Sequence, residues 1–160
     1  EFLKEKLLQL FSKNLDVKPI VQPEYLSTYW PRLNSEINSW IDWRMKFENL
    51  SSFIKAFDDP YNGAQTTFKN KKVYIKKCSC NYEDAKFHPF QSGIIYRKGP
   101  DWICVAANEG SVIIEEVFDK SGKNILKNLN VGDRFFTPEK QLSNTSKRIY
   151  YNSEGIKKIK

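Results

Sequence analysis

The sequence predicts a mainly β domain with flanking helices, arranged as a small open barrel of five or six antiparallel strands packed with one helix. Three observations support this fold class. Short segments of alternating apolar and polar residues follow one another closely after residue 64. Turn-forming residues separate these segments, and an amphipathic helical segment precedes them. A flat five-stranded sheet covered by one helix is the alternative arrangement.

The composition is that of a folded, basic protein. The chain has 160 residues, of which 40% are hydrophobic, enough to bury a core. Its 26 Lys and Arg against 19 Asp and Glu give a net charge of +7, which permits binding to phosphates or acidic surfaces. No apolar run approaches the ~20 residues that cross a bilayer, so no membrane partner is expected. The chain has no signal peptide pattern. Because it begins with Glu1 rather than Met, we expect it to be part of a longer protein.

The first 40 residues should form an appendage to the barrel. Apolar residues recur at helical spacing near the start of the chain, at Leu3, Leu7, Leu10 and Phe11. Prolines at 19, 23 and 31 then exclude a long helix, so residues 17–40 should be an extended linker. We interpret residues 1–16 as the last helix of a preceding domain.

A second helix is predicted over residues 44–57, just before the strands. Its buried face should consist of Phe47, Leu50, Ile54 and Phe57. Asp42 is the expected cap, since a carboxylate is favourable at the positive end of a helix. Pro60 ends the helix, because proline cannot continue its hydrogen-bond ladder. Gly63 then supplies the unusual backbone angles of the corner.

The strands should occupy residues 64–68, 72–77, 93–97, 101–107 and 111–118. Residues 79–92 are predicted to form a long irregular loop. A further helix is expected from about 138 to 151, with Leu142, Ser146 and Ile149 on one face. A basic tail ends the chain.

No set of residues in the chain has the pattern of an active site or a metal site. The spacing of Cys78 and Cys80 does not match that of zinc ligands, and a fourth ligand is missing beside His88. With Cys104, the cysteines make an odd number, which favours free thiols in a reducing cytoplasm. His88 is interpreted as a loop histidine packed by aromatic neighbours. Neither a phosphate-binding glycine loop nor a nucleophile elbow is present, so we expect no catalytic residue.

Lysines concentrate around the first predicted hairpin and the loop after it. On a barrel they could follow a phosphate backbone, with Tyr74 or Tyr96 available to stack on bases. A solvated lysine-rich surface is the alternative interpretation. The candidate nucleic-acid-binding residues are Lys69, Lys71, Lys72, Lys76, Lys77 and Lys86.

The order of motifs resembles the C-terminal domain of the folate-dependent formyltransferases, the family of methionyl-tRNA formyltransferase. The resemblance covers residues 1–132. Lys55 replaces the family's Arg at the end of the helix, and Asn62 replaces the second Pro of the corner. The matching motif residues are Ile41, Asp42 and Trp43 at the entry to the domain, and Pro60, Tyr61, Gly63 and Ala64 at the corner.

The resemblance implies a barrel of the oligonucleotide-binding type over residues 41–132, followed by an extension over 133–160 with a helix and the basic tail. It also implies the transfer of a formyl group from 10-formyltetrahydrofolate to an amine. The Asn, His and Asp that catalyse this transfer in the family belong to an N-terminal domain outside these 160 residues. The chain would then hold no folate site. Its expected partners would be that catalytic domain and, for a tRNA acceptor, tRNA in the cytoplasm during translation initiation.

Three functions remain open at this point. The domain could help bind an aminoacyl-tRNA acceptor, or it could be a scaffold in an amino-sugar N-formyltransferase. A free-standing nucleic-acid-binding barrel is the third possibility. The extension beyond Gly132 departs from the tRNA members of the family, and so does the reduction of a Gly-Lys-Lys segment to Gly122–Lys123. Both differences count against a tRNA acceptor.

Overall fold

The computed structural model of the chain describes residues 2–12, 20–28, 32–152 and 155–159. The chain divides into two compact units, Glu1–Trp30 and Pro31–Lys160. The expected linker residues 17–19 and 29–31, and Lys160 of the basic tail, lie outside the described residues, as does the side chain of Leu10.

The first unit contains helix α1 (Phe2–Ser12) and one turn of 3-10 helix, η1 (Glu24–Leu26). The helix predicted at the start of the chain is therefore confirmed. Its described apolar side chains are exposed, namely Leu3, Leu7, Leu8 and Phe11. Among the described residues, no helix of either unit is long and apolar enough to span a membrane.

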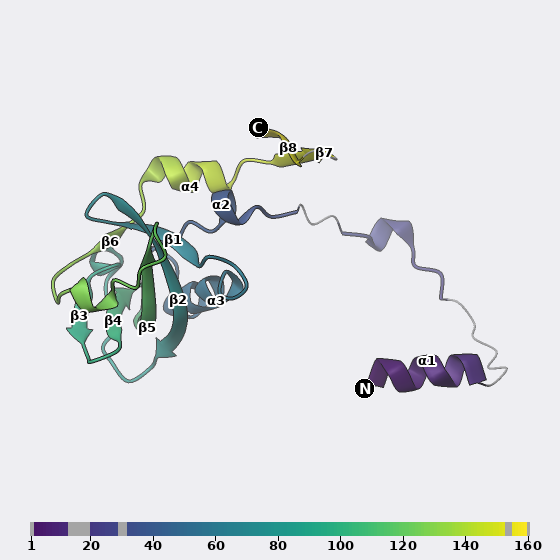
Figure 1. The fold of residues 1–160 in the computed structure, drawn as a ribbon, viewed down its shortest axis with the longest axis horizontal. Helices are drawn as coiled ribbons and strands as arrows, with labels where there is room; N and C mark the ends of the chain where they lie inside the picture. Colours follow the sequence, from purple (N-terminus) through teal and green to yellow (C-terminus); the bar gives the residue numbers. More distant parts are fainter. Residues whose placement is uncertain (1, 13–19, 29–31, 153–154, 160) are drawn as a thin grey trace. The chain divides into compact units, whose positions relative to one another are not determined.

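The second unit is built on a six-stranded antiparallel sheet with the strand order β3-β4-β5-β2-β1-β6 (Figure 1). The strands are β1 (Ala64–Phe68), β2 (Lys71–Asn81), β3 (Ile95–Lys98), β4 (Ile103–Ala107), β5 (Gly110–Asp119) and β6 (Phe135–Phe136). The other elements of this unit are α2 (Ser35–Asn38), α3 (Phe47–Ala56), η2 (Pro89–Gln91), η3 (Leu126–Asn128), α4 (Glu139–Thr145), and a hairpin of β7 (Ile149–Asn152) and β8 (Gly155–Ile159).

The sheet curls until its two edges meet. Backbone hydrogen bonds connect residues 93–95, where β3 begins, to residues 133–135, where β6 begins. Phe135 N–H donates to the Gly93 carbonyl at 2.9 Å, and Ile95 N–H donates to the Asp133 carbonyl at 2.8 Å. Strand β2 bends at Lys77, whose φ is +48°. Before the bend the buried residues of β2 are the odd-numbered Val73 and Ile75, and after it the buried residue is the even-numbered Cys78. The predicted oligonucleotide-binding type of barrel is thus confirmed as a curled antiparallel sheet.

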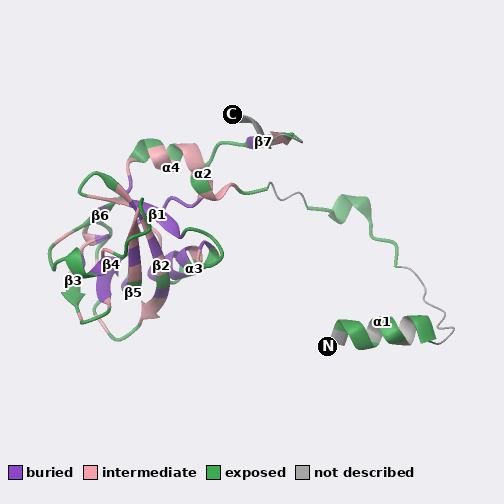
Figure 2. Ribbon diagram, viewed as in Figure 1, coloured by how far each residue is buried: buried purple, intermediate pink, exposed green. Residues whose placement is uncertain are grey.

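The core lies between the curled sheet and α3 (Figure 2). The four apolar residues predicted for the buried face of α3 are all buried, and Leu50 and Ile54 have no exposed surface. From the sheet, side chains such as Ile75, Val105 and Ile114 complete this core. Burying aliphatic side chains of this size stabilises a fold by about 1.5–3 kcal/mol each.

Three predictions about secondary structure were wrong. Asp42 does not cap α3, because α3 begins five residues later and its N-cap is Lys46; the Asp42 carboxylate instead accepts hydrogen bonds from the Arg44 backbone and guanidinium. Residues 79–81 belong to β2, since they pair with β5. The helix predicted from about 138 to 151 ends at Thr145, and the β-branched and aromatic residues after it form β7.

Candidate nucleic-acid interface

The entry motif at residues 41–43 is part of the barrel wall. Ile41 N–H donates to the carbonyl of Gln65 in β1 at 2.8 Å. The Trp43 ring stacks on Phe135, with centroids 5.5 Å apart and planes at 5°, and its Nε1 donates to Thr66 Oγ1 at 2.9 Å. Trp43 is 6% exposed. The entry motif, which precedes α3 in the chain, is therefore fixed to strands β1 and β6 of the sheet.

The corner at residues 58–64 holds α3 against the bend in β2. Gly63 has a φ of +109°, a conformation that residues with a side chain rarely adopt. The Asp58 carboxylate accepts the Lys77 N–H at 3.1 Å, which satisfies a backbone donor at the bend. The Asp59 carboxylate lies 2.6 Å from Lys76 Nζ. The corner is thus tied to β2 by two neighbouring carboxylates.

Two of the predicted lysines lie on the outer face of β2 with Tyr74. Lys72, Tyr74 and Lys76 are partly buried, whereas Val73 and Ile75 point into the core, as the alternation predicts. Lys72 Nζ lies 3.2 Å from Glu36 and 5.1 Å from the centre of the Tyr74 ring. Its side chain is 22% exposed. We conclude that Lys72 fastens α2 to the sheet and is poorly placed to reach a phosphate.

The remaining lysines of the hairpin lie at one end of the barrel. Lys69 is the first of two turn residues with positive φ between β1 and β2, and its Nζ is 3.4 Å from Asp133. Lys71 is exposed. Because Val73 pairs with Asp119, the turn that follows β5 reaches this same end. We call this group of exposed lysines the basic end; its members are Lys69, Lys71, Lys120 and Lys123.

A surface hollow beside Tyr74 adjoins the basic end. Its volume is about 280 Å³. It contains an aromatic face and two lysines, which are the groups that single-stranded nucleic acids contact through bases and phosphates. We call it the Tyr74 hollow; it is lined by Asn62, Tyr74, Lys76, Phe118, Asp119, Lys120 and Gly122.

The last two predicted lysines are not part of this surface. Lys77 pairs with Glu116 of β5. Lys86 is exposed in the loop after β2, close enough to Glu109 to lower the pKa of that carboxyl, after the larger effect of Lys46. Glu109 is in the turn between β4 and β5, at the opposite end of β2 from the hairpin. The six lysines therefore do not form one continuous stripe.

Tyr96 is also unavailable for stacking on a base. Its hydroxyl donates to Asp84 Oδ2 at 2.5 Å and accepts from the Ser111 hydroxyl at 2.8 Å, and its ring packs on Phe87 with centroids 4.7 Å apart. Arg97 donates to the other oxygen of Asp84 at 2.9 Å. Asp84 therefore fastens the loop that follows β2 to β3. The hydrogen bonds from Tyr96 and Arg97 lower the pKa of Asp84 below its ordinary value.

Replacing Asp84 with Asn should lower the melting temperature at pH 7. A carboxyl whose pKa is lower in the folded state stabilises the fold above its unfolded pKa of about 4, and the stabilisation disappears as the pH falls through the folded value. The difference in melting temperature between wild type and Asp84→Asn should therefore narrow below about pH 4. Asp101→Asn, at an exposed turn, is the control. A difference that stays constant down to pH 2 would contradict the role of Asp84.

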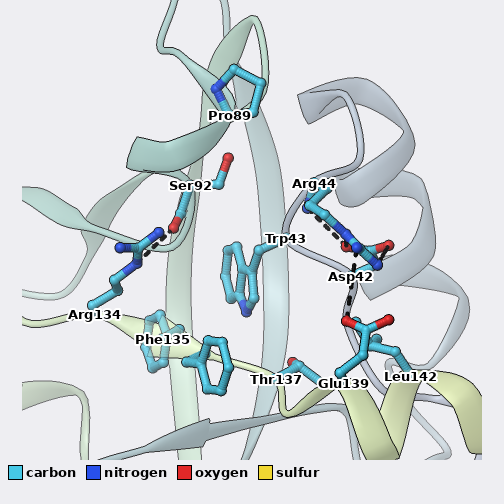
Figure 3. A pocket seen from close by; sticks show the side chains of 11 residues that line it. Asp42, Trp43, Arg44, Pro89, Ser92, Arg134, Phe135, Thr137, Glu139 and Leu142 are labelled. Atoms are coloured by element: carbon cyan, nitrogen blue, oxygen red, sulfur yellow. Dashed lines mark hydrogen bonds and ion pairs between the residues drawn. The ribbon is translucent and has the colours of Figure 1, made fainter.

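A second cavity was not predicted from the sequence. It has a volume of about 140 Å³ and lies between the entry motif, the η2 segment and the residues around β6 (Figure 3). We call it the Trp43 pocket. Arg134 donates to the carbonyls of Ser92 at 3.1 Å and Phe90 at 2.6 Å. The pocket is lined by Asp42, Trp43, Arg44, Pro89, Ser92, Arg134, Phe135, Phe136, Thr137, Glu139 and Leu142. These residues come from three separate parts of the chain, 42–44, 89–92 and 134–142, so no sequence spacing indicates the pocket.

The single histidine and two of the cysteines take part in the local structure, as a helix cap and as buried thiols. His88 Nδ1 accepts the Phe90 N–H at 3.4 Å and so caps η2, and its ring lies against Phe90. Burial raises the pKa of the Cys78 thiol to about 12 and also raises that of Cys104, so both stay protonated at neutral pH. The described residues contain no group of three or more His, Cys, Asp or Glu side chains that could hold a metal ion.

Known proteins resemble this chain at three levels: a family model, two curated proteins of related sequence, and solved structures with a similar fold. A family model described as the C-terminal domain of formyl transferases matches residues 35–130. A methionyl-tRNA formyltransferase of Acetivibrio thermocellus is 30% identical over 122 residues, covering 76% of this chain and 37% of the relative. One of Dictyoglomus turgidum is 30% identical over 132 residues, covering 77% and 41%. The chain thus spans about two fifths of these curated relatives.

Solved structures of HypX from Aquifex aeolicus have a similar fold. A multiple variant superposes with a TM-score of 0.55 at 19% identity, covering 76% of this chain and 20% of HypX. The complex of HypX with tetrahydrofolic acid gives a TM-score of 0.55 at 20% identity, with the same coverage. At this identity the similarity concerns the fold.

Proposed function

Because the chain belongs to the family of formyl transferase C-terminal domains, we propose that it is the acceptor-binding part of a longer formyltransferase. In this proposal the preceding N-terminal domain binds 10-formyltetrahydrofolate and carries out the transfer. The present chain contributes a surface for the molecule whose amine is formylated. Helix α1, whose described apolar side chains are exposed, would be the last helix of the catalytic domain.

We infer that the acceptor is an aminoacyl-tRNA. The Tyr74 hollow is the observation that carries this inference, since it combines a stacking surface with the exposed Lys120 of the basic end. Both curated relatives are methionyl-tRNA formyltransferases, which supports the same acceptor. A role in translation initiation, and a cytoplasmic location, would follow from it.

An amino sugar is the second candidate acceptor, and the ion pairs of the lysines favour it. Of the six lysines predicted to bind nucleic acid, four have a carboxylate partner within 4 Å, namely Lys69, Lys72, Lys76 and Lys77. Such pairs neutralise part of the positive surface. In an amino-sugar enzyme the domain would be a scaffold, and the lysines would serve the stability and solubility of the barrel.

Affinity for tRNA distinguishes these two acceptors. We expect the 160-residue chain to bind unmodified tRNA at low salt, and Lys71→Gln/Lys120→Gln/Lys123→Gln to bind it more weakly, because all three lysines are exposed. The control variant is Lys55→Gln/Lys86→Gln/Lys140→Gln, which removes the same charge at exposed positions outside the basic end and the Tyr74 hollow. Filter binding or fluorescence anisotropy would measure both. Equal losses of affinity in the two variants would favour the amino-sugar acceptor.

A further inference from the structure

The Trp43 pocket has the size and the aromatic lining of a site for a small ring. Trp43 and Phe135, whose rings stack on each other, line it (Figure 3). Phe136 is also part of the lining and is 60% exposed. A cavity of about 150 Å³ holds a molecule the size of benzene. The volume of about 140 Å³ therefore accommodates one ring of a base, and the rest of a two-ring base would lie against the exposed Phe136 side chain.

The charges around the Trp43 pocket balance one another. Its lining contains two arginines, Arg44 and Arg134, and two carboxylates, Asp42 and Glu139. Arg44 holds Asp42 at 2.8 Å and lies 3.8 Å from Glu139. A simple anion would gain little attraction from four charges that sum to zero. A neutral group that both donates and accepts hydrogen bonds can use both kinds of residue.

One polar group at the pocket has no hydrogen-bond partner. The Ser92 hydroxyl oxygen is buried, the residue is 3% exposed, and no described group of the protein bonds to it. Buried hydroxyls are nearly always hydrogen-bonded. Because this oxygen has almost no accessible surface, its side chain would have to rotate toward the pocket before a ligand there could offer the missing partner. Exposed carboxylate oxygens of Glu139 would accept an exocyclic amino group, and the guanidinium groups would donate to ring nitrogens or carbonyls.

From this combination we propose that the Trp43 pocket binds one unpaired nucleobase of an RNA ligand. A nucleobase is flat, uncharged, and carries donors and acceptors on its edge, and Phe136 is placed to stack on it. Lys69 of the basic end lies 3.4 Å from Asp133, the residue before Arg134. An RNA strand held by the basic end would therefore pass close to the pocket. The inference rests on the proposed function, because it presupposes an RNA acceptor.

A fluorescent RNA trinucleotide with a terminal 2-aminopurine tests the proposal. Stacking of this base should quench its fluorescence when the 160-residue chain is added. The variant Phe136→Ala should weaken the affinity about 5- to 150-fold, the range that one base–aromatic contact contributes. Phe136→Tyr keeps the ring and should retain the affinity. Tyr25→Ala, which removes a ring that is 84% exposed outside this unit, is the control. Circular dichroism of each variant checks its folding.

Competition with unlabelled RNA separates binding of the base from binding of phosphates. An adenosine trinucleotide should displace the probe, and an abasic trinucleotide with the same phosphates should not. Displacement by both, or quenching that survives in Phe136→Ala, would overturn the proposal. If tRNA binds in a lysine-dependent manner but the probe is not quenched, only the pocket proposal fails. If the probe is quenched with the expected variant pattern while tRNA does not bind, the proposed function fails and the pocket remains a nucleobase site.

Discussion

Replacing Gly63 with Ala is expected to lower the free energy of unfolding by roughly 2–6 kcal/mol. A residue with a side chain is strained at a φ of +109°, which costs about 1–3 kcal/mol. In addition, a Cβ at this position would lie 2.9 Å from the Ile75 carbonyl oxygen, and overlap of this kind costs about 1–3 kcal/mol. Ile75 pairs with Ala64 in the β1–β2 ladder, so its backbone cannot move away without disturbing that register.

A second glycine provides the control for this prediction. Gly122 also has a positive φ, +80°, but a Cβ there would meet no atom within 4 Å. Gly122→Ala should therefore cost only the strain, roughly 1–3 kcal/mol. Urea denaturation of both variants would measure the difference. Equal losses of stability would show that the contact between the corner and β2 does not matter.

Replacing Trp43 with Ala is expected to lower the free energy of unfolding by roughly 3–5 kcal/mol, the usual cost of removing a buried aromatic side chain. The change removes the stack on Phe135 and the hydrogen bond to Thr66 together. Trp43→Phe keeps a ring on Phe135 and should lose about 0.5–1.5 kcal/mol for the hydrogen bond. Thermal and urea unfolding of both variants would test whether Trp43→Ala loses more stability than Trp43→Phe. A Trp43→Ala variant as stable as wild type would contradict a structural role for the entry motif.

The pattern of apolar residues was sufficient to predict most of the barrel. The face of α3, from Phe47 to Phe57, and the alternation of Val73 and Ile75 in β2 match the structure because burial alone sets these periods. The bend at Lys77 was not predictable. It shifts the buried positions by one, so Ser79 to Asn81 no longer continue the alternation that marked the strand, and only pairing with β5 shows that they belong to it.

The surroundings of the lysines could not be predicted for a different reason. The carboxylates that pair with Lys72, Lys76 and Lys77 are 36, 17 and 39 residues away in the sequence. The register of the strands and the corner at residues 58–64 bring each lysine to its carboxylate. The spacing of charged residues along the sequence indicates neither the register nor the position of the corner. The sequence therefore identified a lysine-rich region correctly but not which of its members are free to meet a ligand.

The Trp43 pocket could not be predicted for the same reason, because its lining residues are far apart in the sequence. Trp43 was recognised as part of a motif, but its neighbours Ser92 and Arg134 come from segments that meet only because the sheet closes between residues 93–95 and 132–135. Part of its lining, including Phe136 and Glu139, lies beyond the residues that the family model matches.

The dependence of tRNA affinity on salt tests the proposed acceptor most directly. Each phosphate contact releases counterions, so the logarithm of the association constant should fall linearly with the logarithm of the salt concentration. For Lys71→Gln/Lys120→Gln/Lys123→Gln we expect this slope to be smaller in magnitude by roughly 3 than for wild type, at about 0.9 per lost contact. The control Lys55→Gln/Lys86→Gln/Lys140→Gln should keep the wild-type slope. A slope that is the same in all three proteins, or the absence of binding by wild type at low salt, would contradict a tRNA acceptor.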